Sequence, residues 1–306
     1  MEKVVIVGAG ICGLTLASLL SAVSKPALLI EKSKSVGGRL ATRRDGDATF
    51  DHGATFYVDS DHESLVWHQR WQENKKSIHW FSEDQRKYFC GAKGMTSLAK
   101  DLAEGKSIQL SEKVISFQKS ENGIEISCES GRLIAAQKIV LTCPLPQALQ
   151  ILSASQISFP EPLKSISYSP AIVGLFELEA NEDLYNFNLL RPGSAIFTIA
   201  NNQAKGISKN LALTVVMNDR WSENNFDLED ALVLQMIEQE LTQFLKGTGQ
   251  IQRAQIKKWR YSQPKSVYPE LFVSLEQGQV FLAGDAFGGG SIAGAVRSAK
   301  AVFSLR

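Results

Sequence analysis

The first 31 residues hold the pattern that most narrows the folds open to this chain. Val4–Val7 is a run of apolar, β-branched residues, which is typical of a strand buried on both faces of a parallel sheet. Three glycines follow in the spacing Gly-x-Gly-x-x-Gly, at Gly8, Gly10 and Gly13. Residues 14–20 are typical of a helix, and a second apolar run, 27–30, ends in Glu31. This order of strand, turn, helix, strand and acid predicts a dinucleotide-binding βαβ unit.

Each part of this unit has a physical role in holding a dinucleotide. Gly8 permits the tight turn, Gly10 lets a pyrophosphate approach the backbone, and Gly13 lets the helix pack closely on the strand. The helix N-terminus presents free N–H groups and a positive dipole end to the phosphates. Glu31, at the tip of the second strand, is suited to accept hydrogen bonds from a ribose diol. The alternative, a glycine-rich turn without a ligand, is disfavoured because every part occurs in order.

A second glycine turn, Gly37-Gly38-Arg39, indicates which dinucleotide is bound. It resembles the pattern of flavoproteins of the amine oxidase type, in which the arginine lies along the FAD phosphates and ribose. Arginine suits that role because its planar fork binds phosphate oxygens in pairs. The alternative is a basic surface turn, since Arg43 and Arg44 follow closely. After the βαβ unit, the second turn favours FAD.

Composition and charge are those of an ordinary soluble globular chain. Of 306 residues, 44% are hydrophobic and 21% are charged, and the formal net charge is +1. The length suits one large domain or two medium ones. A charge so close to zero provides no broad field to recruit nucleic acid or an anionic membrane, and basic residues form no run longer than a pair. Nucleic-acid binding is therefore disfavoured.

The start of the chain and its cysteines bear on the compartment. The chain begins Met-Glu-Lys directly before the first strand, and no apolar segment approaches the ~20 residues that span a bilayer. The cysteines are far apart and fit a reducing compartment: Cys12, Cys90, Cys128 and Cys143. We expect a cytoplasmic protein without a membrane span. The histidines His52, His62, His68 and His79 lack metal-ligand spacing, so no metal site is expected.

Two segments between residues 49 and 89 continue the resemblance. Phe50-Asp51-His52-Gly53-Ala54 resembles the F-D-x-G-A segment of the same flavoproteins, in which the backbone passes beside the flavin ring. Phe56 and Tyr57 follow, and two readings stay open for them: a wall of a substrate cavity, or core. In the stretch 59–89, Trp67 and Trp71 share one face of a predicted helix. We expect these tryptophans to be core and the stretch to belong to a substrate-facing part of the protein.

The middle of the chain predicts more of the FAD-binding part. Thr96 or Ser97 is predicted to cap a helix that resembles the G-M-x-x-L-x-x-x-L helix of amine oxidases. Segments 113–117, 123–128 and 132–134 are predicted to form a three-stranded meander with turns at Asn122-Gly123 and Ser130-Gly131, followed by a separate buried strand, 138–143. In the flavoprotein pattern, the residue matching Val114 touches the adenine, and the Thr142-Cys143-Pro144 turn crosses back over the cofactor.

The C-terminal segment adds the other half of the expected site. Val280–Ala283 is a buried strand that ends in Gly284-Asp285, and a helix begins at Ser291 or Ile292 after a glycine-rich loop, 288–290. In FAD proteins of this kind, such an Asp binds the ribityl chain or a phosphate, and the helix N-terminus points at the flavin N1–C2=O edge. A helix dipole there stabilises the negative charge of reduced flavin.

The order of motifs over essentially the whole chain resembles the flavin amine oxidase superfamily, and within it the renalase-like branch. Lys258-Trp259-Arg260-Tyr261-Ser262-Gln263-Pro264 is similar to the R-W-R-Y-A-x-P segment of bacterial renalase-like proteins. The resemblance implies an FAD-dependent oxidase that oxidises isomeric dihydropyridine forms of NAD(P)H and reduces oxygen to hydrogen peroxide. One departure is the segment 292–295, Ile-Ala-Gly-Ala, which lacks the acid of the usual E-G-A. No cysteine follows Cys143 and no histidine follows His79, so we expect non-covalent FAD.

The resemblance implies an α/β fold with a Rossmann-like FAD-binding domain, made of a βαβ unit plus a β-meander, and a second substrate domain of mixed sheet and helix. The FAD-binding domain is predicted to be discontinuous, over 1–57, 90–146 and 277–306, and the substrate domain to cover 58–89 and 147–276. The residues predicted to bind FAD are Gly8, Gly10, Ile11, Cys12, Gly13, Glu31, Lys32, Gly38, Arg39, Leu40, Gly53, Ala54, Thr55, Val114, Thr142, Gly284, Asp285, Gly294 and Ala295. The residues predicted to contact substrate are Phe56, Tyr57, Trp259 and Tyr261.

The expected reaction is hydride transfer from a bound dihydropyridine to flavin N5. Such a transfer needs no strong general base, so no catalytic acid or base is assigned. Arg260 is a candidate to bind an anionic part of the substrate, although strand alternation can face it away from Trp259 and Tyr261.

Three alternatives stay open at this point. They are another FAD-dependent amine oxidase or desaturase, a non-catalytic binding protein on the same fold, and an NAD-dependent dehydrogenase, which leaves Gly284-Asp285 unexplained. The physiological substrate, the electron acceptor and the oligomeric state also stay open.

Overall fold

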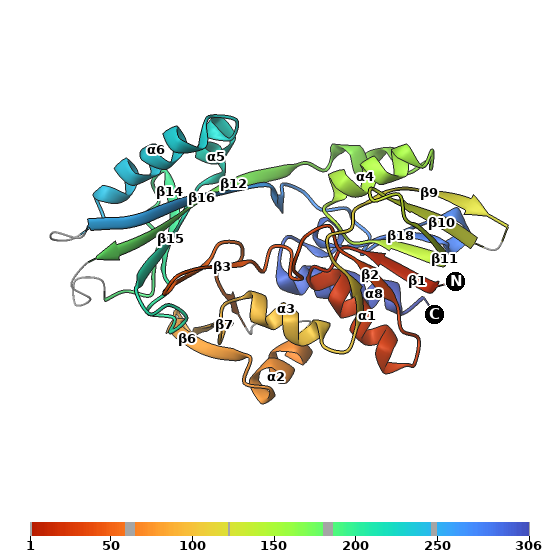
Figure 1. Cartoon of the computed structure of the whole chain (residues 1–306), viewed down its shortest axis with the longest axis horizontal. Coiled ribbons are helices and arrows are strands. Elements are labelled where there is room, and N and C mark those ends of the chain that lie inside the picture. The colour runs from red at the N-terminus through yellow and green to blue at the C-terminus, as the bar shows by residue number, and fades with distance from the viewer. Residues whose placement is uncertain (1, 59–64, 122, 180–185, 246–249, 306) are drawn as a thin grey trace.

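The computed structural model describes residues 2–58, 65–121, 123–179, 186–245 and 250–305. Its two main sheets lie at opposite ends of an elongated molecule, and both chain termini lie beside the first sheet (Figure 1). A smaller third sheet lies below the second one in this view. This α/β architecture, with a βαβ unit, a meander and a separate second sheet, confirms the predicted fold class.

Within the described residues, eight strands form the first sheet. Six of them lie side by side in the order β17 (Val273–Leu275), β18 (Val280–Leu282), β11 (Leu133–Leu141), β1 (Glu2–Val7), β2 (Leu28–Ile30) and β8 (Ser107–Gln109). The other two, β10 (Gly123–Cys128) and β9 (Val114–Ser120), extend from β11 as a meander. β1 is parallel to β2 and β11, and β11 is parallel to β18. Because parallel strands end at the same edge, the residues that follow them lie together there: Gly8, Glu31, Thr142 and Gly284.

Both faces of the first sheet are covered. Helices α1 (Ile11–Ala22) and α8 (Ile292–Phe303) pack together on one face, and α3 (Thr96–Ala103) packs beside α1. The meander and α4 (Leu145–Ala154) bury the other face. Ile6 therefore belongs to one core and Val5 and Val7 to the other, which explains why β1 is apolar throughout.

Among the described residues, helices cover one face of the second sheet. Its order is β13 (Leu189–Leu190), β14 (Ile196–Asn201), β15 (Leu211–Met217), β12 (Tyr168–Glu179) and β16 (Gln250–Pro264), and α5 (Asp219–Asn225) and α6 (Asp230–Thr242) pack on its outer face. Part of the inner face packs on β4 (Ala48–Asp51), which pairs with β3 (Thr42–Asp45). β12 and β16 run from this sheet toward the first one (Figure 1).

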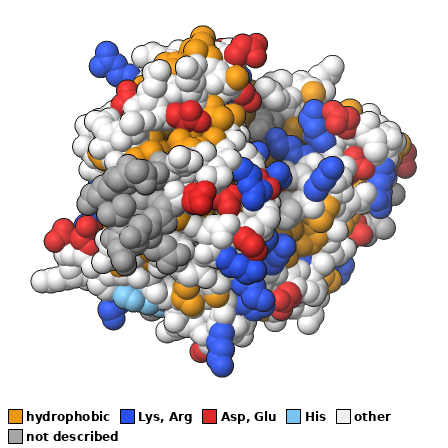
Figure 2. Space-filling view, turned by 60° about the vertical axis from the view of Figure 1, so that its left-hand side comes forward, with side chains coloured by type: hydrophobic (Ala, Val, Ile, Leu, Met, Phe, Trp, Pro, Cys, Tyr) orange, Lys and Arg blue, Asp and Glu red, His pale blue; other side chains and the backbone are white. Residues whose placement is uncertain are grey.

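The third sheet is small and rich in aromatic residues. It contains β5 (Tyr57–Val58), β7 (Arg86–Gly91) and β6 (Ser77–Glu83), with α2 (Leu65–Glu73) packed beside it. Trp67 and Trp71 of α2 are both buried, so they belong to the core as predicted. Lys and Arg side chains mix with Asp and Glu over the face shown in Figure 2, which accords with a net charge of +1.

Several local expectations differ from the structure. Two predicted strands, 132–134 and 138–143, correspond to the single strand β11, which covers 133–141, because its first half pairs with β10 and its second half with β1. The predicted cap at Thr96 or Ser97 is wrong: Met95 precedes α3, and the Thr96 hydroxyl donates to the Leu40 carbonyl instead. Asn122, placed in a predicted turn, lies outside the described residues.

The division into two domains remains a prediction. β17, which the predicted bounds place in the substrate domain, pairs with β18 of the first sheet.

Candidate functional site

A cavity of about 1570 Å³ is lined by both main sheets. One part of its wall consists of the residues that follow β1, β2, β11 and β18, and another part is the inner face of the second sheet. Pockets for small molecules are typically about 300–1,000 Å³. This cavity therefore has room for an extended dinucleotide together with a second flat ring.

The glycine turn after β1 leaves its backbone open to the cavity. Gly8 has φ of 104°, a conformation that side chains rarely adopt. A Cβ built on Gly10 would meet no atom within 4 Å, and Gly10 lines the cavity. A Cβ on Gly13 would instead overlap the Gly8 carbonyl oxygen, so glycine is needed there for α1 to pack on the turn. This geometry agrees with the three roles inferred from the glycine spacing.

Glu31 is buried beside this turn and ties it to β2. Its Oε2 accepts a hydrogen bond from the Ala9 N–H at 2.8 Å, and its Oε1 accepts one from the Ser33 N–H at 2.8 Å. A carboxylate has about four acceptor positions, so each oxygen retains capacity for a ribose hydroxyl. Because Glu31 also lines the cavity, it is well placed to bind a ribose diol.

Arg39 and Asp285 meet in the cavity wall and join the two ends of the chain. Arg39 Nη1 lies 2.6 Å from Asp285 Oδ2 and donates to the Ser262 carbonyl at 2.8 Å. The Tyr168 hydroxyl donates to Asp285 Oδ1 at 3.1 Å. Burial lowers the pKa of Arg39, but the hydrogen bond and charge of Asp285 outweigh it, so the pKa is raised. Burial, and then Asp285, raise the pKa of Tyr168, which therefore remains a neutral donor.

The N-terminus of α8 opens onto the same cavity. Ser291 caps the helix, and its Oγ accepts a hydrogen bond from the Gly294 N–H at 3.0 Å. A Cβ on Gly294 would overlap the Gly289 carbonyl oxygen, so the close turn before α8 needs glycine. The first turn of α8 carries no acidic residue, and the positive end of its dipole favours negative charge at this wall.

The inner face of the second sheet forms a flat apolar wall of the cavity. Its register places Thr198 of β14 beside Val216 of β15, and Val216 beside Val173 of β12. On the neighbouring strand, Trp259 pairs with Ala171. All five residues line the cavity, so the wall combines small aliphatic side chains with one tryptophan.

Trp259 is held in one orientation by His52. Its Nε1 donates to the His52 carbonyl at 2.7 Å, and the two rings stack with centroids 5.5 Å apart and an interplanar angle of 21°. Burial, and then the charge of Lys257, lower the pKa of His52 from 6.5 to about 4. The imidazole is therefore neutral at neutral pH.

The other predicted substrate residues differ in how they meet the cavity. Phe56 and Tyr261 are half-buried and line it. Tyr57 also borders the cavity, but its side chain is buried and its hydroxyl lies 2.6 Å from Ser77 Oγ. Because its ring packs on Trp71, the structure favours the core alternative for the Tyr57 side chain.

Arg260 points to the opposite face of β16 from Trp259. Its guanidinium lies 4.6 Å from the Phe226 ring centroid and 3.4 Å from Asp227 Oδ1. The alternation of side chains along a strand accounts for this placement. Arg260 is therefore not positioned to bind an anionic part of a substrate beside Trp259.

The residues predicted to bind FAD all line this one cavity except Gly13 and Gly294, whose role is to permit close packing at the start of their helices. The structure thus brings segments from both ends of the chain together. Binding of FAD by these particular residues stays a prediction.

The sequence pattern did not single out several residues of the wall. Val216 and His52 line the cavity, and Tyr168 donates to Asp285 of the wall, but the residues next to them in the chain assign them no role in the site. No local signal marks them, because their partners are far away in the chain: 117 residues separate Tyr168 from Asp285.

The side chains of the wall fit FAD. Three of its cations, Lys32, Arg44 and Lys100, have no carboxylate partner among the described residues, which suits an anionic nucleotide. Burial raises the pKa of Cys12 and raises that of Cys143 to about 12, so neither thiol in the cavity wall is a thiolate at neutral pH.

The described residues offer neither a metal site nor a membrane-spanning helix. The described residues contain no group of His, Cys, Asp and Glu side chains that could hold a metal ion. None of the helices described is long and apolar enough to cross a membrane.

Comparison with known proteins places this geometry among flavin enzymes. The family model of flavin-containing amine oxidoreductases matches residues 66–302, and that of NAD(P)-binding Rossmann-like domains matches residues 6–69. Renalase of Mus musculus is 25% identical over 343 residues, which cover 100% of this chain and 98% of renalase.

Solved structures show the same fold over the full length. A candidate protoporphyrinogen oxidase from Exiguobacterium sp. 255-15 superposes with a TM-score of 0.77 at 14% identity. A triple mutant of putrescine oxidase with redesigned cofactor binding superposes with a TM-score of 0.75 at 13% identity. In both cases 99% of this chain and 98% of the other are covered.

Proposed function

The chain belongs to the family of flavin-containing amine oxidoreductases, and from this premise we propose that it oxidises a dihydropyridine, an isomeric dihydro form of NAD(P). It is an FAD-dependent oxidase. The relationship to renalase extends over the whole chain and supports the proposed substrate class.

One observation favours a dihydropyridine over an amine. The carboxylates among the described lining residues are Glu31, Glu112 and Asp285. Each is already engaged: Glu31 by two backbone N–H groups, Glu112 by Ser130, and Asp285 by Arg39. An amine is a cation at neutral pH, and the residues of the apolar wall, Ala171, Val173, Thr198, Val216 and Trp259, offer it no carboxylate. A neutral ring on an anionic nucleotide needs none.

The apolar wall is suited to the flat ring of such a substrate. Val173, Val216 and Ala171 leave a shallow surface, and Trp259 stands at its side in the orientation fixed by His52. Stacking between this indole and a dihydropyridine would hold the substrate ring parallel to the wall and exclude water from it.

FAD held in this cavity would supply the hydride acceptor and the redox link to oxygen. In the overall reaction, the dihydropyridine loses a hydride and becomes NAD(P)⁺, while oxygen takes up that hydride and one proton to form hydrogen peroxide. The chain contributes orientation and charge rather than acid–base catalysis, because an electron-rich dihydropyridine needs no base to release hydride. The N-terminus of α8 would stabilise the negative charge that develops on the ring system.

We further propose that the FAD is not covalently attached. Both cysteines in the wall are buried with raised pKa values, and reaction of a thiol requires the thiolate.

The decisive experiment mixes the FAD-loaded protein anaerobically with single substrates and follows the flavin colour. The substrates are isomeric dihydronicotinamide dinucleotides, ordinary NADH and NADPH, and a panel of amines. We expect the isomers to bleach the flavin fastest, and peroxide to appear when oxygen is admitted. Bleaching only by an amine would replace this proposal with an amine oxidase. A bound flavin that no substrate reduces would support the non-catalytic alternative.

A further inference from the structure

A buried ion pair lies behind the cavity wall and has no part in the reaction proposed above. Lys205 follows β14 and Asp51 ends β4, and both side chains are 0% exposed. Lys205 Nζ lies 3.2 Å from Asp51 Oδ2. Burial of two charges is costly unless further hydrogen bonds satisfy both ions, so their other partners indicate what the pair does.

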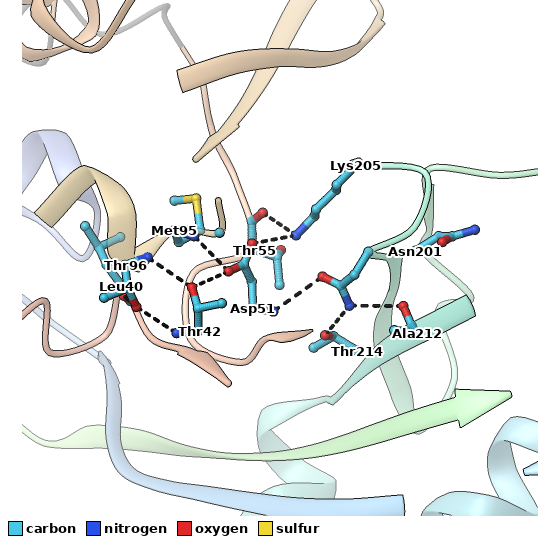
Figure 3. A network of polar contacts seen from close by, with 12 residues as sticks. Leu40, Thr42, Asp51, Thr55, Met95, Thr96, Asn201, Lys205, Ala212 and Thr214 are labelled. Atoms are coloured by element: carbon cyan, nitrogen blue, oxygen red, sulfur yellow. Dashed lines mark hydrogen bonds and ion pairs between the residues drawn. The ribbon is translucent and has the colours of Figure 1, made fainter. Parts of the chain in front are cut away.

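Asp51 joins three separate segments of the chain. Its Oδ1 accepts hydrogen bonds from the Thr42 hydroxyl at 2.7 Å and from the Met95 N–H at 2.8 Å (Figure 3). Its own N–H donates to Asn202 Oδ1 at 3.4 Å. Asp51 is therefore a fixed anchor, and the position of the Lys205 ammonium is fixed with it.

Lys205 holds one peptide group of the cavity wall. Its Nζ donates to the Thr55 carbonyl at 2.7 Å (Figure 3). It also lies 4.8 Å from the centroid of the Trp80 ring. Thr55 and Phe56 line the cavity, whereas Lys205 does not. The Thr55–Phe56 peptide therefore stands between the lysine and the cavity.

The orientation of that peptide leaves a donor on the cavity side. In a planar trans peptide, the carbonyl of one residue and the N–H of the next point in opposite directions, and the described chain has no cis bond. Because the Thr55 carbonyl points to Lys205, the Phe56 N–H points the other way. Among the described residues, this N–H has no hydrogen-bond acceptor. Because Phe56 lines the cavity, this N–H is free to donate to a group bound there.

We propose that Lys205 is a positioning residue, which holds the Thr55–Phe56 peptide so that the Phe56 N–H donates to a heteroaromatic ring bound in the cavity. The acceptor is a ring nitrogen or carbonyl oxygen, supplied either by the flavin or by the carboxamide of a nicotinamide. The inference requires FAD in the cavity, but it does not depend on oxidation of a dihydropyridine.

The test measures amide hydrogen exchange at Phe56 with single-residue resolution. The full-length protein is compared without FAD, with FAD, and with FAD plus a dihydronicotinamide dinucleotide. We expect one ligand to slow exchange at Phe56 by about tenfold or more, as a new hydrogen bond does. Protection by FAD alone identifies the flavin as the acceptor, and protection only in the third state identifies the nicotinamide. The Ala54 N–H, which donates to the Arg39 carbonyl at 2.8 Å, serves as a reference that stays protected throughout.

The role of Lys205 is tested in the double variant Lys205→Met/Asp51→Asn, which leaves no single buried charge to unfold the protein. We expect Ala54 to stay protected, the ligand-dependent protection of Phe56 to be lost, and affinity for the protecting ligand to fall about tenfold. Lys209→Met is the matched control, because Lys209 lies on the same turn and pairs with Asp47 at the surface. It should behave as the wild type does.

The inference is overturned if neither ligand changes exchange at Phe56, or if the double variant keeps the wild-type protection. A protein that shows FAD-dependent protection at Phe56 but oxidises no dihydropyridine would retain this inference and lose the proposed function.

Discussion

The guanidinium of Arg39 lies 2.6 Å from the carboxylate of Asp285, although 246 residues separate the two in the chain. Arg39 belongs to the glycine turn after β2, and Asp285 follows β18 near the C-terminus. The pair shows that the opening βαβ unit and the terminal Gly-Asp segment form one site. This contact brings together the two parts of the cavity wall that we predict to hold a single extended nucleotide.

Replacement of Arg39 tests whether this pair holds the cofactor. In Arg39→Met, Asp285 would be left buried without its partner, close to the proposed site of the FAD phosphates. We expect FAD affinity to fall by about 100-fold, because the site loses a phosphate-binding guanidinium and keeps the Asp285 carboxylate without a cation. Fluorescence titration of the apoprotein with FAD measures it. Arg43→Met is the control, because Arg43 is exposed on β3 and does not line the cavity, and equal loss in both variants would refute the role of Arg39.

Two glycine substitutions separate ligand contact from packing. Gly10 has φ of −77°, and a side chain there enters open space, so Gly10→Val should leave the apoprotein stable and weaken FAD binding by about 100-fold. Gly13→Ala should instead destabilise the apoprotein by about 1–3 kcal/mol, because the new Cβ overlaps the Gly8 carbonyl. Urea unfolding and FAD titration give both quantities. Equal effects of the two changes on stability would contradict this assignment.

Trp259 is predicted to act on the substrate and not on FAD. Trp259→Ala removes one stacking surface, which contributes about 1–3 kcal/mol to binding of a flat ring. We therefore expect kcat/KM for the dihydropyridine to fall by about 10–100-fold, with FAD retained. Trp221→Ala is the comparison, since Trp221 packs with the core beside α6 and does not line the cavity. Stopped-flow reduction of the flavin measures the effect. Wild-type kinetics in Trp259→Ala would exclude the stacking role.

His52 should make the stability depend on pH in the acid range. Its pKa is about 4 in the folded protein and about 6.5 in the unfolded chain, so the unfolded state binds an extra proton between these values. Stability is therefore lost as pH falls from about 6.5 to 4, with a slope of up to about 1.4 kcal/mol per pH unit from this group. In His52→Phe the slope should decrease by that amount. Urea unfolding at pH 7, 6 and 5 provides the comparison, and identical slopes would refute the buried neutral histidine.

Non-covalent FAD predicts that the yellow colour is released on denaturation. After acid precipitation of the loaded protein, we expect the flavin in the supernatant, because the thiols of Cys12 and Cys143 are protonated. Absorbance of the supernatant and of the dissolved pellet measures the distribution. Colour that stays with the pellet would show a covalent bond.

Much of the cofactor half of the site follows from short segments of sequence. Turn geometry and helix packing require particular residue types at a few positions, and these requirements involve only residues close by in the chain. The positions are the glycines Gly8, Gly10 and Gly13, the acid Glu31 and the Gly284-Asp285 ending. The parallel pairing of β1, β2, β11 and β18 then places them at one edge of a sheet. Local chemistry and strand direction together were enough to predict this edge.

The substrate half depends on contacts that no local pattern encodes. Lys205 reaches Thr55 across 150 residues, Trp259 reaches His52 across 207, and the ring of Tyr57 lies in the aromatic core although Phe56 lines the cavity. These contacts form only when the second sheet packs over β4 and the F-D-x-G-A segment. Residue spacing determines on which face of a strand a side chain lies. The packing of two distant sheets determines which residues that face contacts, because such packing depends on the shape and volume of both surfaces at once.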